Sequence, residues 1–262
     1  MSLAEALVEL QELTERLRRE CPWDREQTAR TIVPHTVEEA YEVADAAQSG
    51  DDAKLLDEIG DLLFQAYFLA LLLQERGTGD LEKAARGISA KLIRRHPHIF
   101  GATQVASAGV VRQRWEEIKR NDEGRAGVFH EVPENLPGLS YARKVQQRAK
   151  SAGFEYPDLA GALADFEDEL RELREELPAS DPAPETEPDA RVASELGDVL
   201  FAAVNVARRL NVDLELEVRT AAKRFRARVD RAVELAAADA RDWTALPLDE
   251  QDVYYDKAKE TE

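Results

Sequence analysis

Apolar residues recur at helical spacing along almost the whole chain. Near the start, the leucines from Leu3 to Leu17 follow one another at intervals of three and four residues, which places them on one face of a helix. The alternating apolar and polar positions that are typical of strands are hard to find. The stretch from Leu62 to Leu73 is apolar on every face apart from Gln65, which is typical of a buried helix. The pattern predicts an all-α protein.

Two segments interrupt the helical pattern. Residues 121–138 are rich in Gly, Pro and Asn, which indicates a linker between domains. Residues 178–189 hold prolines and acidic residues in alternation, and this composition predicts a solvated loop. We therefore expect an N-terminal helical domain at 1–122, a linker at 123–138 and a C-terminal helical domain at 139–262.

The two predicted domains resemble each other in sequence. The segment EIGDLLF at 58–64 returns as ELGDVLF at 195–201, and each copy follows an acidic helix, predicted at 37–48 and 166–177. A helix with a basic segment follows in both halves, so that Lys91 corresponds to Arg224 and Arg95 to Arg228. The shared order of three segments predicts a tandem duplication.

Carboxylates gather at both ends of residues 38–61. Glu39 with Glu42, and Glu58 with Asp61, are three residues apart and share a helical face. If the two helices pack antiparallel through the short turn at 49–52, the four carboxylates converge, and a divalent cation such as Mg²⁺ relieves their repulsion. The alternative is an ordinary solvated face or a favourable helix N-terminus. The matching pattern in the second half favours a metal site.

Basic residues follow the carboxylates in both halves. Lys91, Arg94 and Arg95 are predicted to close a helix, and so is the second-half group of Lys223, Arg224, Arg226 and Arg228. Such groups suit a polyphosphate, although cations also stabilise helix C-termini without any ligand. Carboxylates for a metal together with cations for phosphate indicate phosphoryl chemistry.

Composition narrows the choice of partners and compartment. The chain has 262 residues and a formal net charge of −18, which opposes binding to a nucleic-acid polymer. The single cysteine, Cys21, excludes an intramolecular disulfide and is interpreted as structural. The first residues lack the basic segment of a signal peptide, and the longest apolar stretch falls short of the ~20 residues of a membrane span. We expect a soluble, cytoplasmic protein with no membrane partner.

Several other site types lack their motifs. His96 and His98 flank Pro97 and cannot share a helical face, and no Glu-x-x-His occurs, which argues against a ferritin-like di-iron site. No G-x-x-x-x-G-K-[ST] phosphate loop is present.

The ordered motifs resemble those of a known family. They are CPWDREQT at 21–28, TVEEAYEV at 36–43, EIGDLLFQ at 58–65, KLIRRHPHIFG at 91–101, RWEEIK at 114–119 and ELGDVLFA at 195–202. Together they closely resemble the two-domain MazG proteins of the all-α nucleoside triphosphate pyrophosphatase superfamily, over essentially the whole chain. The resemblance implies four-helix bundles in a homodimer. It also implies Mg²⁺-dependent hydrolysis of nucleoside triphosphates to the monophosphate and pyrophosphate, with broad base tolerance and with Mn²⁺ as a substitute.

The resemblance also assigns roles to individual positions. The implied metal ligands are Glu39, Glu42, Glu58, Asp61, Glu169, Glu172, Glu195 and Asp198. The implied substrate-binding residues are Lys91, Arg94, Arg95, Arg224 and Arg228 for the phosphates and Tyr255 for the base. Glu38 or Asp168 is the expected general base.

The chain departs from the family pattern at three places in its second half. Asp168 stands where a glutamate is usual, and Tyr156 and Tyr255 stand where relatives often carry tryptophan. Two alternatives remain open at this point. One is an acidic helical binding or regulatory protein with a vestigial nucleotide site, and the other is a narrower pyrophosphatase for dUTP, dCTP or an oxidised nucleotide.

Overall fold

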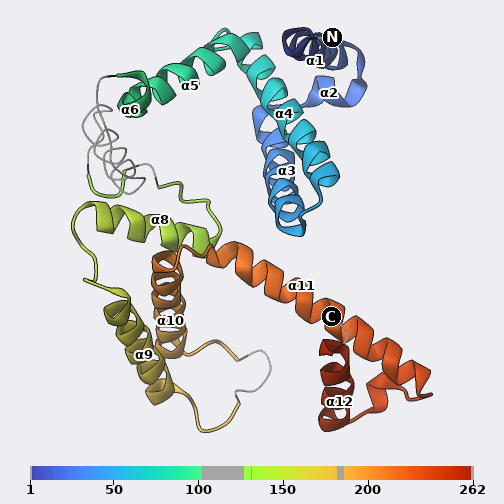
Figure 1. Cartoon of the computed structure of the whole chain (residues 1–262), viewed down its shortest axis with the longest axis vertical. Helices are drawn as coiled ribbons and strands as arrows, with labels where there is room; N and C mark the ends of the chain where they lie inside the picture. Colours follow the sequence, from blue (N-terminus) through green and yellow to red (C-terminus); the bar gives the residue numbers. More distant parts are fainter. Residues whose placement is uncertain (1, 102–126, 131, 182–185, 261–262) are drawn as a thin grey trace. The chain divides into compact units, whose positions relative to one another are not determined.

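The computed structural model describes residues 2–101, 127–130, 132–181 and 186–260, and this part of the chain is almost entirely helical (Figure 1). Its ordered elements are α-helices and one short 3₁₀ turn, η1, with no strand among the described residues. The all-α prediction is confirmed. None of the described helices combines the length and apolar character that crossing a bilayer requires.

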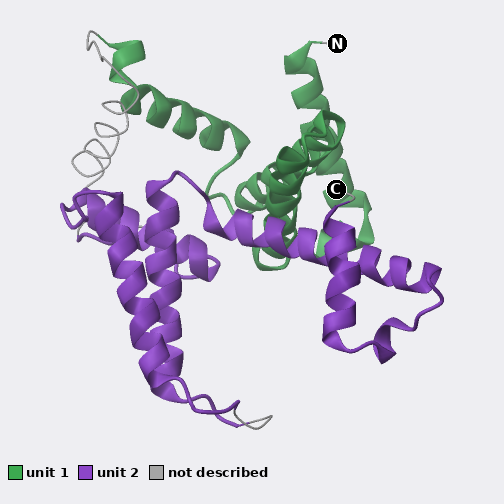
Figure 2. Cartoon of the chain, turned by 60° about the horizontal axis from the view of Figure 1, so that its bottom comes forward, with its two compact units in different colours: residues 1–124 green, residues 125–262 purple. Residues whose placement is uncertain are grey.

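The chain divides into two compact units, Met1–Gly124 and Arg125–Glu262 (Figure 2). Residues 102–126, which include the RWEEIK motif at 114–119 and the start of the predicted linker, lie outside the described residues. The tandem duplication of the two units stays a prediction.

The first unit is built around two long helices. Its elements are α1 (Leu3–Glu20), α2 (Pro22–Glu26), α3 (Ala29–Ser49), α4 (Asp52–Glu75), α5 (Leu81–Arg95) and α6 (Pro97–Phe100). Helices α3 and α4 pack against each other along their length, and α1 packs on α4. Ile32 of α3 and Phe68 and Leu72 of α4 form a buried core between these helices. Burying such side chains contributes roughly 1.5–3 kcal/mol each, so this contact holds the pair together.

The α3–α4 turn follows from its local sequence. Gly50 ends α3 with a φ of 72°, a left-handed conformation that glycine adopts without steric cost. Asp51 then caps α4 by accepting hydrogen bonds from the backbone N–H groups of Ala53 and Lys54 at 3.0 Å each. The tight connection forces α3 and α4 to run antiparallel.

A partly buried arginine ties the N-terminal segments to this pair. The Arg18 guanidinium donates to Glu75 of α4 at 2.8 and 2.9 Å and to the carbonyl oxygens of Asp24 and Gln27. It also lies 5.8 Å from the centre of the Phe68 ring. Cys21, predicted to be structural, is half-buried at the junction of α1 and α2.

The second unit repeats the packing of two long helices. Its elements are α8 (Gly138–Ser151), α9 (Leu159–Glu176), α10 (Ala190–Arg209), α11 (Leu214–Ala238), η1 (Trp243–Ala245) and α12 (Leu248–Lys259). Helices α9 and α10 pack along their length and α8 packs on α10, whereas α12 packs on α11. Ala232, Ala236, Leu246, Tyr254 and Ala258 form the core between α11 and α12. The described residues of the predicted loop at 178–189 lie between α9 and α10 and are not helical.

Two sequence expectations differ from the structure. The basic group at 223–228 was expected to close a helix, but α11 continues to Ala238, because the residues after the group keep burying Ala232 and Ala236 against α12. The helix over 62–73 was expected to be buried all round. Leu63 and Leu73 are both 37% exposed instead, because α3 and α1 cover only part of the surface of α4.

Candidate functional site

The first carboxylate cluster lies between α3 and α4. Glu39 projects from α3, while Glu58 and Asp61 project from α4, where their spacing of three residues puts them on one face. One oxygen from each of the three side chains lies within 4.8 Å of the others. Glu39 and Glu58 are half-buried and Asp61 is exposed. The antiparallel turn at Gly50 therefore brings together carboxylates that are about twenty residues apart in sequence.

Glu42 adds a fourth negative charge beside this cluster. Burial raises the pKa of Glu39, and the charges of Asp61, Glu42 and Glu58 raise it further. Burial also raises the pKa of Glu58, as does the charge of Glu42, while the Lys54 amine acts in the opposite direction. The predicted set of four carboxylates is thus a group of three with Glu42 as a close electrostatic neighbour.

The second cluster has the same construction between α9 and α10. Glu169 of α9 and Glu195 and Asp198 of α10 bring one carboxylate oxygen each within 4.8 Å of the others. Burial raises the pKa of Glu169, and so do the charges of Asp198, Glu172, Asp165 and Glu195, in decreasing order. The sequence analysis missed Asp165. Asp165 could have been found from its position four residues before Glu169, because this spacing places both side chains on one face of α9.

Both clusters fit a hard divalent cation. Each offers carboxylate oxygens from two facing helices, which is the donor type that Mg²⁺, Mn²⁺ and Ca²⁺ accept. Burial raises the pKa values of Glu39, Glu58 and Glu169, and the charges of neighbouring carboxylates raise them further. A bound cation removes this repulsion between carboxylates. These two groups are accordingly the candidate metal sites of the described residues.

The repulsion leads to a testable expectation for Glu169→Gln. Because the folded-state pKa of Glu169 is raised, its contribution to stability is full below about pH 4.3, the ordinary glutamate value, and is lost as the pH rises through the folded-state pKa. At pH 7.5 the metal-free variant should therefore melt at a higher temperature than the native chain. It should also gain less from added divalent cation. Scanning calorimetry measures both, with Glu167→Gln on the same helix as the control, and a lower melting temperature contradicts the expectation.

The two expected general bases are not among these groups of three. Glu38 is exposed, and its Oε2 lies 3.7 Å from Nδ1 of His35 on the same helix. Asp168 is also exposed and lies 3.4 Å from the guanidinium of Arg171. Glu38 directly precedes Glu39 in the sequence, and Asp168 directly precedes Glu169. The catalytic role of Glu38 and Asp168 stays a prediction.

The predicted phosphate-binding residues lie on other helices. Lys91, Arg94 and Arg95 are on α5, which packs on α4 and α6, and Arg95 is only 9% exposed. Arg224 and Arg228 are on α11, and Tyr255 is on α12. The structure places the ring of Tyr255 5.8 Å from that of Phe225 and 4.8 Å from Nζ of Lys259. It does not place either set within the two carboxylate groups of three.

In each unit an aromatic side chain contacts the residue that stands four positions before the glutamate of α3 or α9. The Tyr156 hydroxyl donates to Oδ1 of Asp165 at 2.6 Å, and this bond raises the pKa of Tyr156 to about 12. In the first unit His35 occupies the position four before Glu39, and its ring meets that of Trp23 edge-on at 5.8 Å. These contacts were not predicted, and they give the two clusters different neighbours.

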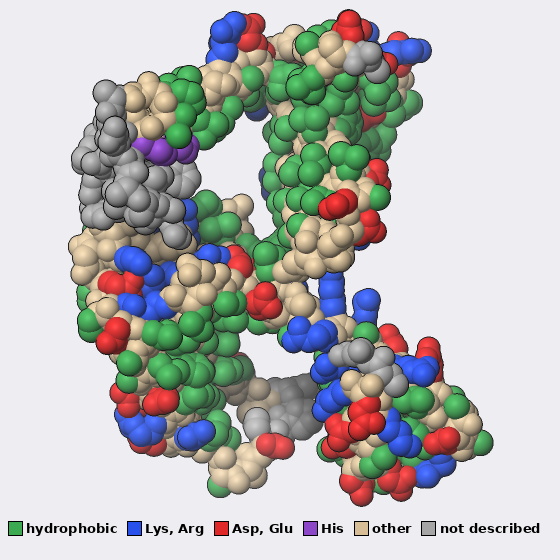
Figure 3. All heavy atoms as spheres, viewed as in Figure 1, with side chains coloured by type: hydrophobic (Ala, Val, Ile, Leu, Met, Phe, Trp, Pro, Cys, Tyr) green, Lys and Arg blue, Asp and Glu red, His purple; other side chains and the backbone are tan. Residues whose placement is uncertain are grey.

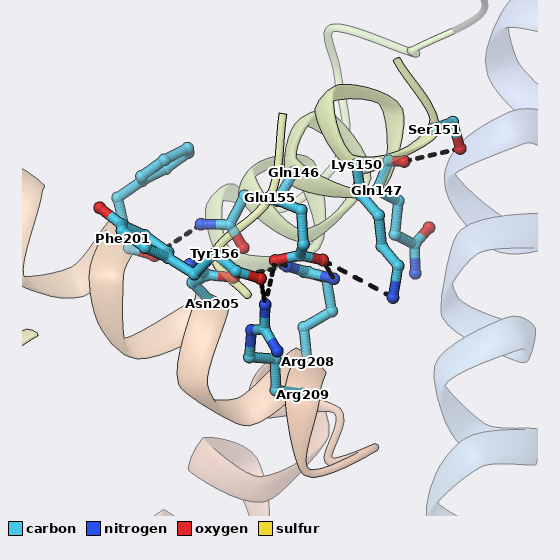
Figure 4. Close-up of polar contacts among 10 residues, drawn as sticks. All are labelled: Gln146, Gln147, Lys150, Ser151, Glu155, Tyr156, Phe201, Asn205, Arg208 and Arg209. Atoms are coloured by element: carbon cyan, nitrogen blue, oxygen red, sulfur yellow. Dashed lines mark hydrogen bonds and ion pairs between the residues drawn. The ribbon is translucent and has the colours of Figure 1, made fainter. Parts of the chain in front are cut away.

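A buried ion-pair group holds the loop that carries Tyr156 (Figure 4). Glu155 accepts hydrogen bonds from Arg208 at 2.8 and 3.0 Å and from Arg209 at 2.9 Å, and Lys150 lies 3.6 Å away. Arg209 also donates to the backbone oxygen of Tyr156. Burial alone raises the pKa of Glu155, but the three cations outweigh it, so the pKa is lowered. The group fastens the loop to the C-terminal end of α10.

Removing the anion of this group should destabilise the second unit strongly. The Arg208 and Glu155 side chains are 7% and 18% exposed, so Glu155→Ala leaves buried cations without a partner and costs about 3 kcal/mol. Because the pKa of Glu155 is lowered, its stabilisation is present above about pH 4.3 and is lost as the pH falls through the folded-state value. Urea unfolding at pH 7 and pH 4 measures both effects. Glu175→Ala, which removes an exposed ion pair with Arg171, is the control and should change little; equal effects of the two variants contradict the expectation.

The fold and these clusters define an all-α protein with two carboxylate sites of like construction. The family model of the MazG nucleotide pyrophosphohydrolase domain matches residues 27–100, and this range contains the first cluster. A nucleoside triphosphate pyrophosphohydrolase/pyrophosphatase MazG of Thermotoga maritima is 38% identical over 255 residues, 96% of this chain and 94% of that protein. A nucleoside triphosphate pyrophosphohydrolase of Escherichia coli is 35% identical over 245 residues, 92% and 91% of the two chains.

A solved structure is also similar to part of the chain. The crystal structure of a mazG-related protein from Thermotoga maritima is 33% identical, covers 43% of this chain and 98% of its own, and has a TM-score of 0.39. The relatives from Thermotoga maritima and Escherichia coli are 38% and 35% identical to this chain over more than 90% of each protein, which establishes its family. The chain belongs to the MazG family.

Proposed function

We propose that this protein hydrolyses nucleoside and deoxynucleoside triphosphates to the monophosphate and pyrophosphate, with Mg²⁺ as the cofactor and Mn²⁺ as a substitute. The observation that carries the proposal is the carboxylate group of three between antiparallel helices, present in both units of a MazG-family chain. Full-length relatives bear the name nucleoside triphosphate pyrophosphohydrolase, which fits this reaction. Broad base tolerance and a role in clearing the cytoplasmic nucleotide pool follow as part of the same proposal.

Different residues of the chain have different roles in the proposed reaction. The carboxylates predicted as ligands, four in each unit, would hold a divalent cation, which would neutralise the phosphate oxygens and polarise the attacking water. Glu38 or Asp168, next to the cluster in sequence, accepts the proton of that water at a carboxylate oxygen. The cations Lys91, Arg94, Arg95, Arg224 and Arg228 bind the phosphate tail, and Tyr255 offers a ring face for the base. One water is consumed, and the bond between the α-phosphorus and the bridging oxygen is broken.

A homodimer is the second part of the proposal. Apolar side chains form a stripe on α4, at Leu56, Ile59 and Leu63, with exposures of 73, 48 and 37%. Leu196 and Leu200 of α10 are 49 and 50% exposed at a spacing of four residues. Figure 3 shows a broad hydrophobic surface over α3 and α4. Contiguous apolar surface of this kind suits a second copy of the chain, which would complete four-helix bundles and bring further cations to each cluster.

Product analysis over a nucleotide panel tests the proposed reaction. The protein is incubated with each common ribo- and deoxyribonucleoside triphosphate, and with oxidised forms, in the presence of Mg²⁺ or of EDTA. We expect monophosphate and pyrophosphate in every Mg²⁺ reaction, with rates that differ little between bases, and no product in EDTA. Release of diphosphate and orthophosphate contradicts the reaction. Turnover of dUTP, dCTP or an oxidised nucleotide alone contradicts broad tolerance, and absence of both turnover and binding favours a regulatory role.

A further inference from the structure

A buried amide of α4 lies next to the first carboxylate cluster. The side chain of Gln65 is only 7% exposed, and its Oε1 has no hydrogen-bond partner among the residues that the structure describes. A buried carbonyl oxygen of this kind is costly to leave without a donor, so most such groups have a partner in the functional state. Nothing in the proposed reaction so far uses Gln65.

The position of Gln65 on α4 directs it toward the cluster. It follows Asp61 by four residues, one helical turn, so the two side chains share a face. Helical side chains lean toward the N-terminus of their helix, and therefore Gln65 covers the turn that starts at Asp61. On its other side lie Phe68 and Leu72 of the apolar core with Ile32. The amide thus stands between the carboxylates and the core.

The second unit has its buried amide on a different helix. Gln146 of α8 is 7% exposed and donates to the backbone oxygen of Phe201 at 2.7 Å, and its Oε1 has no partner among the described residues. Gly60-Asp61 corresponds to Gly197-Asp198 in the sequence, and the position four residues after the aspartate is then Ala202, which is 3% exposed. The two clusters share their carboxylates but differ one turn further along the helix. A buried acceptor on the same helix as the aspartate, one turn further along, is a feature of the first cluster alone among these two.

We propose that Oε1 of Gln65 accepts a hydrogen bond from a sugar hydroxyl of the nucleotide held at the first cluster, making Gln65 a specificity-determining residue. The inference rests on the proposed function. The carboxylates and their cation hold the phosphates, and the sugar is the part of a nucleotide joined directly to the α-phosphate. Its 2′ and 3′ hydroxyls are hydrogen-bond donors, and an unpaired carbonyl oxygen needs a donor as its partner. A site with a buried polar group rejects an analogue without the matching group, because that polar group is then left unpaired.

Titration calorimetry on a chain with only the first cluster tests this role. In Asp198→Asn protein with Mg²⁺, the ligands are α,β-methylene-ATP, its 2′-deoxy form and its 2′,3′-dideoxy form. With Gln65 intact, the analogue without the recognised hydroxyl should bind about 3- to 10-fold more weakly, the range expected for one neutral hydrogen bond. The two analogues distinguish the 2′ from the 3′ hydroxyl. In Gln65→Met, which keeps the volume but removes the acceptor, the three ligands should bind alike.

Controls separate this role from folding and from the proposed reaction. Mn²⁺ affinity, measured by electron paramagnetic resonance without nucleotide, should be equal for Gln65→Met and its parent, and thermal unfolding confirms that the variant is folded. In an Asp61→Asn chain, which keeps the second cluster and Ala202, the relative affinities of the three ligands should be the same with Gln65 and with Gln65→Met. Unchanged discrimination in Gln65→Met, equal weakening of all three ligands, or no nucleotide binding at the first cluster overturns the inference. Turnover by the Asp61→Asn chain tests the proposed reaction independently.

Discussion

Replacing Asp198 by asparagine together with Asp61 by asparagine should abolish nucleotide hydrolysis, with a fall in kcat/KM of about 100-fold or more. Each substitution keeps the shape of the side chain but removes one charge from a group whose oxygens lie within 4.8 Å of one another. Altering a residue that merely supports a metal ligand typically costs 10–100-fold, so loss of a ligand in both clusters sets a larger expectation. The measurement is steady-state turnover at saturating Mg²⁺.

The single variants assign turnover to one cluster or to both. If the clusters act separately, the activities of Asp61→Asn and Asp198→Asn sum to that of the native chain. The variant with the lower remaining activity is the one whose substitution disables the more active cluster. Glu167→Gln removes an exposed carboxylate of α9 outside the cluster and should leave the rate unchanged. Native activity in the double variant contradicts the assignment of these carboxylates.

Replacing Leu200 by glutamate should convert the protein from a dimer to a monomer. Leu200 is 50% exposed and lies on the same face of α10 as Leu196, so a charge there opposes burial against a second chain. Size-exclusion chromatography with light scattering measures the mass directly, and we expect 29.3 kDa for the variant and twice that for the native chain. Turnover should fall as well, since the proposed dimer brings cations to the carboxylates.

A matched variant separates this effect from simple loss of surface apolarity. Leu3→Glu changes a leucine that is 77% exposed on α1 and belongs to neither the stripe on α4 nor that on α10, and this variant should remain dimeric. Far-ultraviolet circular dichroism verifies that both variants are helical. A native chain that runs as a monomer at micromolar concentration contradicts the proposed dimer.

The carboxylate clusters could be predicted because their causes are local. A spacing of three residues puts Glu58 and Asp61 on one face, and Gly50 followed by Asp51 encodes a tight turn that returns α4 along α3. The pairing of α9 and α10 had a different signal, an acidic segment followed by the proline-rich loop and the repeated Glu-x-x-Asp motif. Of the four carboxylates predicted in each unit, the structure brings one oxygen each of three within 4.8 Å of one another, and Glu42 and Glu172 are their charged neighbours. Metal binding by Glu42 and Glu172 stays a prediction.

Contacts between distant residues escaped prediction. Glu155 meets Arg208 and Arg209 across more than fifty residues, and no periodicity records such a pairing. The length of α11 was misjudged for a similar reason, since it depends on α12 covering Ala232 and Ala236. In the sequence Gln65 is one polar residue in an apolar stretch, and only the structure shows that it is buried and that its Oε1 has no partner among the described residues.

Hydrolysis in ¹⁸O-labelled water tests the central claim most directly. The protein is incubated with Mg²⁺ and ATP in H₂¹⁸O, and the products are analysed by mass spectrometry. Attack of water on the α-phosphorus places one ¹⁸O atom in AMP and none in pyrophosphate, which is the result predicted here. Label in pyrophosphate, or the appearance of ADP with labelled orthophosphate, would contradict the account.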